Sequence, residues 1–313
     1  MTMSEPAVSW SLEQLPGADT ARVVTIGKFD GVHIGHREVI AELSRIAPQA
    51  EVTVVTFDRH PKALLTPDAS PLPLVSTPQK VEFLGGAGAT RVAVIPFTRE
   101  FADLSPEDFA RSVLADGLGA TAVLVGGDFR YGHLGAGDVD TLRDEGKSLG
   151  FSVHTVADVV HDKGERISST RIRRLLDDGD VAGAAQLLGR YHQLRSAVVQ
   201  GHQRGRELGY PTANLDNPPE GFIPRDGVYA TWVDVDGVSY QAATSIGVNP
   251  TFGDVAQRMV ESHLFDFDGV LYGSRVTVHF VEFIRAMNKF PDAQSLADQM
   301  AADATQIKVI LSR

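Results

Sequence analysis

Short apolar runs alternate with helical patterns over the first half of the chain, and this alternation limits the fold more than any other feature. The runs are rich in β-branched residues, as expected of strands buried on both faces. Because strand and helix alternate, we predict an α/β domain built on a doubly wound parallel sheet. The expected strands are Val23–Ile26, Val52–Phe57, Arg91–Ile95, Ala122–Val125 and Ser152–Val156, and the helical patterns are His36–Ile46, Thr77–Leu84, Pro106–Leu114 and Asp138–Leu149.

From Leu194 onward the pattern changes to strands alone. Val228–Val235 alternates apolar and polar residues, Asp236 and Gly237 predict a hairpin turn, and the meander continues through Val238–Ile246. We therefore predict a small antiparallel β-barrel. Its further strands are Glu261–Phe265 and Ser274–Phe283, and a carboxyl-terminal helix over Asp292–Leu311, apolar on one face, is expected to close it.

The chain has 313 residues, more than one hydrophobic core usually serves, so we expect two domains, at 1–187 and 188–313. A net charge of −11 argues against a nucleic-acid partner, although small phosphorylated substrates remain compatible with it.

The absence of cysteine excludes disulfides, thiolate metal sites and cysteine nucleophiles. Residues 1–20 are neither cationic nor apolar, and no stretch approaches the roughly 20 apolar residues of a membrane span, so we expect a cytoplasmic protein.

The segment from Gly27 to His36 follows the first predicted strand and precedes a helix. Gly27 and Gly31 permit a tight turn, and the helix start directs backbone N–H groups and a dipole to one point, which suits a phosphate. His33 and His36 lie beside that point, where imidazoles can donate hydrogen bonds or charge to an oxyanion. We predict a reacting phosphate there; two surface histidines on a turn are the alternative.

Polar residues follow two other predicted strands. The segment Phe57–Pro61, with His60, follows the second strand, and Val125–His133, with Asp128 and Arg130, follows the fourth. The carboxyl ends of parallel strands form the ligand-binding edge of such a sheet, so both segments are expected to reach the same site. Each could also be an ordinary polar loop.

Residues 168–173 open a helix with three hydroxyls and two arginines. Arg171 and Arg173 have the wrong charge for the amino-terminal end of a helix dipole, which indicates an anion as their partner. We interpret Ser169, Thr170 and Arg173 as part of a second phosphate clamp. Simple helix capping by the hydroxyls is the alternative.

The glycine-rich stretch Gly201–Leu215 lies in the predicted barrel. Thr212 and Asn214 offer hard oxygen ligands beside a flexible loop, which suits magnesium bound to a nucleotide, whereas a solvated turn is the plainer alternative. The chain has neither a P-loop motif nor a dinucleotide-binding fingerprint.

With these residues assembled, the chain resembles the bacterial bifunctional riboflavin kinase/FMN adenylyltransferases, also called prokaryotic FAD synthetases. The resemblance runs from about Val23 to Asp303, with the motifs in the expected order. The matching segments are Gly27–His36, Phe57–Pro61, Ser168–Arg173, Gly205–Asn214, Asn249–Phe252, Glu261–Phe267 and Leu271–Gly273.

The resemblance implies that the barrel phosphorylates riboflavin with ATP and that the first domain adenylylates the resulting FMN, with Mg²⁺ and ATP and without a covalent intermediate. It leaves a homo-oligomer open.

The implied catalytic residues are His33, His36 and Glu261, the last as general base. For the adenylyltransferase, ATP would contact Gly27, Phe29, Asp30, Gly31, Ser169, Thr170 and Arg173, and FMN would contact Phe57, His60, Pro61, Asp128 and Arg130. For the kinase, ATP would contact Gly205, Arg206, Pro211, Thr212 and Asn214, the flavin Asn249, Thr251 and Arg285, and the metal Thr212 and Asn214.

The sequence departs from the family pattern at Leu134, Ser196 and His202, where a basic residue, a glycine and an acid are usual. Two other readings therefore stay open at this stage. One is a single-activity adenylyltransferase, and the other is a flavin-binding regulatory protein derived from the enzyme.

Overall fold

The computed structural model describes residues 5–157, 165–200, 212–249 and 257–312. The chain divides into two compact units, Met1–Ser169 and Thr170–Arg313. We predicted the domain boundary between residues 187 and 188, whereas the two compact units meet between residues 169 and 170. Two helices lie between these two positions. These helices, α7 (Ser169–Asp178) and α8 (Val181–Leu188), fall almost entirely within the second unit.

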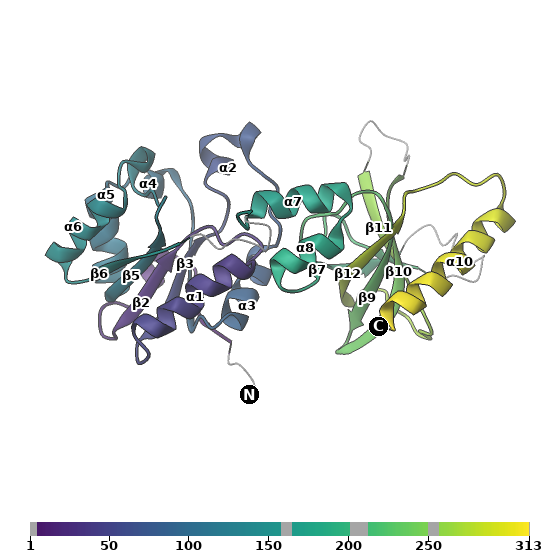
Figure 1. The fold of residues 1–313 in the computed structure, drawn as a ribbon, viewed down its shortest axis with the longest axis horizontal. Helices are drawn as coiled ribbons and strands as arrows, with labels where there is room; N and C mark the ends of the chain where they lie inside the picture. Colours follow the sequence, from purple (N-terminus) through teal and green to yellow (C-terminus); the bar gives the residue numbers. More distant parts are fainter. Residues whose placement is uncertain (1–4, 158–164, 201–211, 250–256, 313) are drawn as a thin grey trace. The chain divides into compact units, whose positions relative to one another are not determined.

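The first unit contains a six-stranded sheet in the order β1-β4-β3-β2-β5-β6, and every pair of neighbours is parallel (Figure 1). The predicted doubly wound sheet is therefore confirmed. Its strands are β2 (Arg22–Ile26), β3 (Glu51–Phe57), β4 (Arg91–Ile95), β5 (Ala120–Gly126) and β6 (Ser152–Val156), with β1 (Ala7–Ser9) added at one edge. We did not predict β1, because three residues are too few to show a period.

The predicted helices of the first unit are present with shifted ends. They are α1 (Ile34–Ile46), α3 (Thr77–Gly86), α5 (Pro106–Phe109), which continues as a π-helix over Ala110–Gly117, and α6 (Val139–Leu149), with short helices α2 (Lys62–Leu65) and α4 (Arg99–Ala102) between strands. Single turns of 3₁₀-helix cover Leu12–Gln14, Pro67–Ala69 and His133–Gly135. The Ser105 hydroxyl caps α5 by accepting from the Asp108 N–H, the usual role of a serine just before a helix.

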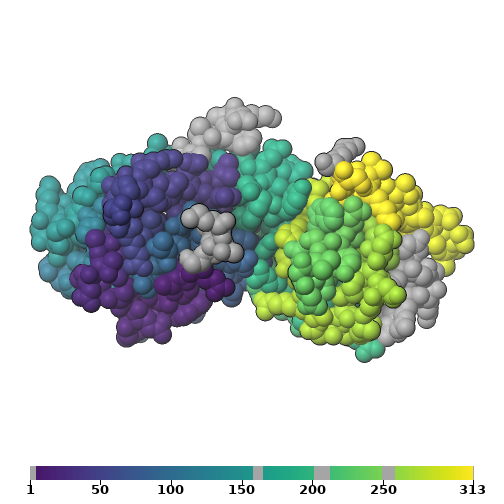
Figure 2. Space-filling view, turned by 90° about the horizontal axis from the view of Figure 1, so that it is seen from below, coloured from purple at the N-terminus to yellow at the C-terminus, as the bar shows by residue number. Residues whose placement is uncertain are grey.

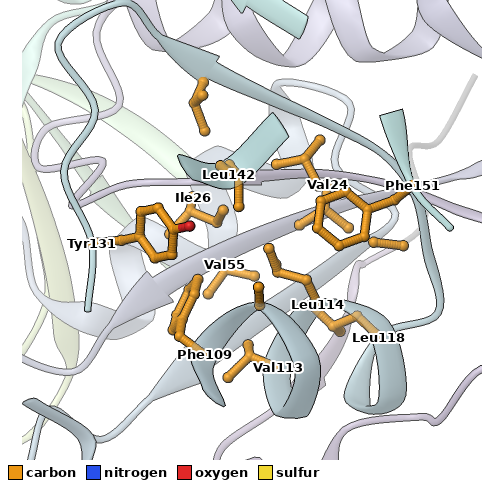
Figure 3. Packing of buried hydrophobic residues seen from close by; sticks show 14 of the residues in the cluster. Val24, Ile26, Val55, Phe109, Val113, Leu114, Leu118, Tyr131, Leu142 and Phe151 are labelled. Atoms are coloured by element: carbon orange, nitrogen blue, oxygen red, sulfur yellow. The ribbon is translucent and has the colours of Figure 1, made fainter. Parts of the chain in front are cut away.

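The core of the first unit lies on both faces of this sheet. Successive strand residues point to opposite faces, so Val24 packs with one group of buried residues and Val23 with the other. The first group includes Phe109, Leu114 and Leu142 from the side of α5 and α6 (Figure 3). The second group lies under α1 and α3 (Figure 1). Burial on both faces explains why the strand sequences are almost continuously apolar.

The second unit is a closed antiparallel barrel in the order β10-β11-β8-β7-β12-β9. Its strands are β7 (His192–Val199), β8 (Ala213–Leu215), β9 (Gly227–Val235), β10 (Val238–Asn249), β11 (Gln257–Leu264) and β12 (Arg275–Arg285). The barrel and its hairpin are as predicted, but β8 lies within the stretch that we read as a glycine-rich loop. That reading was wrong for residues 213–215, whose side chains are buried.

The carboxyl-terminal helix α10 (Ala293–Leu311) lies against the barrel strands, as Figures 1 and 2 show in yellow against green. Ile307 and Leu311 pack there with Ala230 and Phe265. The expected closing helix is thus present. Within the described ranges, each helix is too short or too polar to cross a membrane.

His192 is a buried histidine at the start of β7. Its imidazole is 2% exposed, and its Nε2 lies 2.6 Å from the carbonyl oxygen of Phe222. Burial lowers the pKa of His192 to about 4, with a smaller contribution from Arg190 in the same direction, while the Phe222 carbonyl opposes the shift. The folded protein therefore holds this imidazole neutral.

We predict that the second unit loses stability as the pH falls from about 6.5 to about 4. Between these values the unfolded chain binds a proton at His192 and the folded chain does not, so the free energy of unfolding falls with the pH. Compared with its value above pH 6.5, the free energy of unfolding should be lower by about 2 kcal/mol at pH 5. Urea denaturation in a Trp10→Phe background, where Trp232 is the remaining fluorescent tryptophan, should show a weaker pH dependence in His192→Gln than in the parent. His154→Gln, which changes an exposed histidine, is the control. Equal pH dependence in the parent and His192→Gln would contradict the assignment.

Candidate active sites

The loop between β2 and α1 turns sharply at the carboxyl edge of the sheet. Phe29, Gly31 and Val32 have φ angles of 46°, 81° and 40°. Such angles strain a residue with a β-carbon, by roughly 1–3 kcal/mol each. The side chains of Phe29 and Val32 are buried, at 4% and 1% exposure, and their packing holds the strained loop in place. This arrangement fixes the start of α1 beneath β2.

His33 is the N-cap of α1, which begins two positions earlier than we predicted. Its Nδ1 accepts a hydrogen bond from the backbone N–H of His36 at 3.3 Å. Because an accepting Nδ1 carries no proton, the proton of the neutral ring lies on Nε2. We therefore assign His33 as a hydrogen-bond donor through Nε2. The ring is 6% exposed.

His36 stacks on His33. The ring centroids are 3.5 Å apart and the planes differ by 15°, while Phe29 meets His36 edge-on at 5.0 Å. The two predicted histidines are thus brought together at the start of α1.

Ser169 contacts the same loop. Its Oγ donates to the backbone carbonyl of Asp30 at 2.8 Å, and the buried Asp30 carboxylate accepts from the Leu74 N–H at 2.8 Å. The structure therefore places Ser169, the first of the three residues in the predicted phosphate clamp, in contact with the Gly27–His36 segment. Thr170 and Arg173 follow Ser169 within α7, in the second unit.

The end of β3 separates residues that we had grouped together. The partly buried Phe57 ring packs against Phe97 and Phe101, with centroids 5.3 and 5.9 Å away, at the edge of the core. Its contact with FMN stays a prediction. Asp58 accepts from the Phe97 N–H at 2.8 Å and pairs with Arg59. Burial raises the pKa of Asp58, but Arg59 and the Phe97 N–H together hold it below its usual value.

Beside these residues lies a pocket of about 350 Å³, here called the Lys80 pocket. Its charged and polar lining residues include Lys28, Asp30, Asp58, Arg59, His60 and Lys80. We predicted Asp30 and His60 from the sequence as substrate contacts, but we did not predict Lys80. The available signal was that Lys80 precedes the core residue Leu84 by four positions, which puts a lysine on the buried face of α3.

The loop after β5 carries Asp128 and Arg130, both exposed. Asp128 pairs with Arg166 at 3.2 Å and Arg130 with Asp138 at 3.3 Å. β5 is the neighbour of β2, whereas the chain leaves β2 toward β3 on the other side. This reversal makes the β2–β5 boundary the switch point at which such sheets bind ligands. Leu134, which replaces a basic residue, lies on this loop with 87% exposure.

A second polar site lies on the barrel, where β8 and β11 pair. Glu261 and Asn214 are directly opposed in the antiparallel register, so their side chains share one face of the sheet. Asn214 is buried, and its Nδ2 lies 3.4 Å from the carbonyl of Thr212. Glu261 is half-buried. The strand pairing thus brings together two predicted site residues that are far apart in the sequence, and their catalytic roles stay a prediction.

The oxygens of Thr212 and Asn214 fit a magnesium ion that is bound mainly through a nucleotide. Magnesium takes few protein ligands and completes its shell with phosphates and water. This mode needs no cluster of three acidic or histidine side chains, and none occurs among the described residues.

Comparison with known proteins decides between the alternatives that the sequence left open. The FAD synthetase family model matches residues 16–171, and the riboflavin kinase model matches residues 188–311. The chain belongs to the bifunctional riboflavin kinase/FMN adenylyltransferase family. The match of both models argues against a single-activity adenylyltransferase.

Curated members of this family align over most of their length. The Pseudomonas fluorescens enzyme is 37% identical, over 92% of both chains, and the Bacillus subtilis enzyme is 34% identical, over 90% of both. A crystal structure described as a macrolide-efflux protein from Streptococcus pneumoniae superposes with a TM-score of 0.88 and 32% identity. It covers 97% of this chain and 99% of that one. The whole two-unit fold is therefore shared with a solved protein.

Part of the family pattern lies outside the described residues. This part comprises Gly205, Arg206, Pro211, Thr251, the departure His202 and the side chain of Asn249. Ser196, where the family usually has glycine, is accommodated in β7, and its Oγ donates to the carbonyl of Asp216 at 2.9 Å.

Arg285, which the family pattern assigns to the flavin, makes a close ion pair in this structure. Its Nε and Nη2 donate to the Asp303 carboxylate at 2.8–3.1 Å, and Gln299 donates to the same carboxylate at 2.8 Å. Asp303 is 4% exposed. This pair fixes α10 to the end of β12, and a contact between Arg285 and the flavin stays a prediction.

We predict that Asp303→Asn lowers the unfolding free energy of the second unit by about 3 kcal/mol, because it leaves Arg285 without its buried counter-charge. Urea denaturation followed by Trp232 fluorescence measures the loss. Asp298→Asn on the same helix is the matched control, since the contact of Asp298 with Gln294 is exposed. Equal stability of the two variants would show that apolar contacts alone hold α10.

Proposed function

We propose that the two activities of this family are divided between the two polar sites of this chain. The enzyme phosphorylates riboflavin to FMN and adenylylates FMN to FAD, with ATP as donor in both steps. The Gly27–His36 loop carries out the second step, and the β8–β11 site carries out the first. The pairing of the His33 cap with the stacked His36 is the observation that most supports this division.

In adenylyl transfer, a phosphate oxygen of FMN attacks the α-phosphorus of ATP, and the bond from that phosphorus to the β-phosphate oxygen breaks. Pyrophosphate leaves with the electron pair, so no covalent enzyme intermediate is needed. His33 donates through Nε2 and His36 supplies charge to the α-phosphate oxygens as negative charge develops there. Ser169, Thr170 and Arg173 hold the departing phosphates. Asp128 and Arg130 remain proposed flavin contacts.

In the kinase step, Glu261 accepts the proton of the riboflavin 5′-hydroxyl as its oxygen attacks the γ-phosphorus, and ADP leaves. A primary alcohol is a weak nucleophile at neutral pH, so a positioned base is required. Asn214 is opposed to Glu261 across the strand pair and would hold magnesium with Thr212. When bound, magnesium neutralises charge on the nucleotide phosphates.

We also propose that the enzyme acts in the cytoplasm and that its functional domain boundary lies between residues 187 and 188. Assembly into a homo-oligomer is compatible with both proposals.

We predict opposite losses in His36→Ala and Glu261→Gln. His36→Ala should reduce FAD formation from FMN by about 10²–10³ because the oxyanion loses a donor, and should spare FMN formation from riboflavin. Glu261→Gln should reduce riboflavin phosphorylation by about 10²–10⁴ and spare adenylylation of supplied FMN. Chromatography of flavins after incubation with MgATP measures both steps on each variant.

Each variant serves as the folding control for the other. Parallel losses of both steps in one variant would indicate misfolding and would not support a catalytic role. Full adenylyl transfer in His36→Ala, or full kinase activity in Glu261→Gln, would remove that residue from the mechanism. Wild-type protein that binds flavin but makes neither product would instead indicate a regulatory protein.

A further inference from the structure

Lys80 is a buried lysine at the ligand-binding edge of the first unit. It lies on α3 with 7% exposure, and its Nζ donates to the backbone carbonyl of Phe57, at the end of β3, at 2.9 Å. An ammonium group has three N–H donors. Since one of them reaches Phe57 and Lys80 lines the Lys80 pocket, the ammonium can also donate to a ligand there.

The charge of Lys80 is only partly compensated. Asp30 and Asp58 are the nearby carboxylates, but among the described residues neither forms an ion pair with Lys80 within 4.0 Å. Asp30 instead accepts from the Leu74 N–H, and Asp58 from Arg59 and the Phe97 N–H. Burial lowers the pKa of Lys80, while the two carboxylates act in the opposite direction. An anion in the pocket would complete the compensation.

The position of the pocket indicates which anion. ATP is expected at the β2–β5 switch point, beside His33. The Lys80 pocket lies at the other side of β2, among residues that follow β2 and β3. Adenylyl transfer joins two phosphate-bearing substrates at one loop, and Lys28 and Asp30 of that loop line this pocket. A volume of about 350 Å³ is within the range of small-molecule sites.

We propose that Lys80 binds the 5′-phosphate of FMN in the Lys80 pocket, an inference that rests on the adenylyl transfer proposed above. Lys80 is then a substrate-binding residue that orients the nucleophile. The hydrogen bond to Phe57 holds the ammonium at the pocket wall. Because riboflavin lacks the phosphate, the contact also favours FMN over riboflavin in the first unit.

The test is Lys80→Met in the full chain, which keeps side-chain length and removes the charge. Loss of a charge-assisted hydrogen bond should raise KM for FMN on the order of 10–100-fold in FAD formation. KM for ATP and riboflavin phosphorylation should change little. Lys62→Met removes an exposed lysine from α2 and should leave all constants unchanged. Lys80→Arg should recover part of the affinity for FMN.

Direct binding separates this inference from the proposed function. Calorimetric titration of wild type with FMN should show two sites, one in each unit, and Lys80→Met should lose one of them. If wild type makes no FAD but Lys80→Met still loses a site, adenylyl transfer is refuted and the binding role stands. If wild type makes FAD and Lys80→Met keeps its KM for FMN, or changes only kcat, the binding role is overturned.

A wild-type measurement covers the case in which Lys80→Met does not fold. Reductive methylation followed by peptide mass spectrometry reports the reactivity of each lysine. FMN should protect Lys80 and riboflavin should not. Equal protection by both flavins, or by neither, would overturn the phosphate contact.

Discussion

Burial of the first-unit sheet on both faces is the constraint on which its site depends. Side chains within the strands meet packed helices above and below, so β2, β3 and β5 contain almost only apolar and β-branched residues. Polar groups that act on a ligand can therefore lie only where the strands end. The Gly27–His36 loop, the Lys80 pocket and the loop after β5 all lie at such ends. The closeness of these segments follows from the parallel direction of the strands.

The histidine loop shows how packing supports a strained site. Phe29 and Val32 adopt left-handed backbone angles that are unfavourable for such residues, and both place their side chains in the core. The cost of the backbone is offset by burial of the side chains. The same loop presents the His33 cap and the stacked His36 at the start of α1. The strained loop and the helix start together bring two imidazole rings into contact at the edge of the sheet.

The barrel positions its site by strand register. Glu261 and Asn214 are held side by side because β8 and β11 pair in one register, and a shift by one residue would turn one of them to the opposite face. The buried hydroxyls of Thr231, Thr244 and Ser262 form a chain of 2.7 Å hydrogen bonds across β9, β10 and β11. Such a chain is satisfied in only one alignment of the strands, so it supports the register on which the site depends.

The sequence by itself determined the two-part architecture and most strand and helix positions, because period, glycine placement and helix-start signals are local properties. It also singled out the histidine and hydroxyl segments, whereas Glu261 was named only through resemblance to the family. It did not reveal β1 or β8, since three-residue strands show no period and are defined by their partners. Nor did it reveal that the Phe57 ring packs against Phe97 at the edge of the core, that Arg285 pairs with Asp303, or that Lys80 is buried near two carboxylates. Those facts depend on residues distant in sequence. Burial and pairing decide whether a charged or aromatic side chain serves the fold or faces a ligand, and only the tertiary structure sets both.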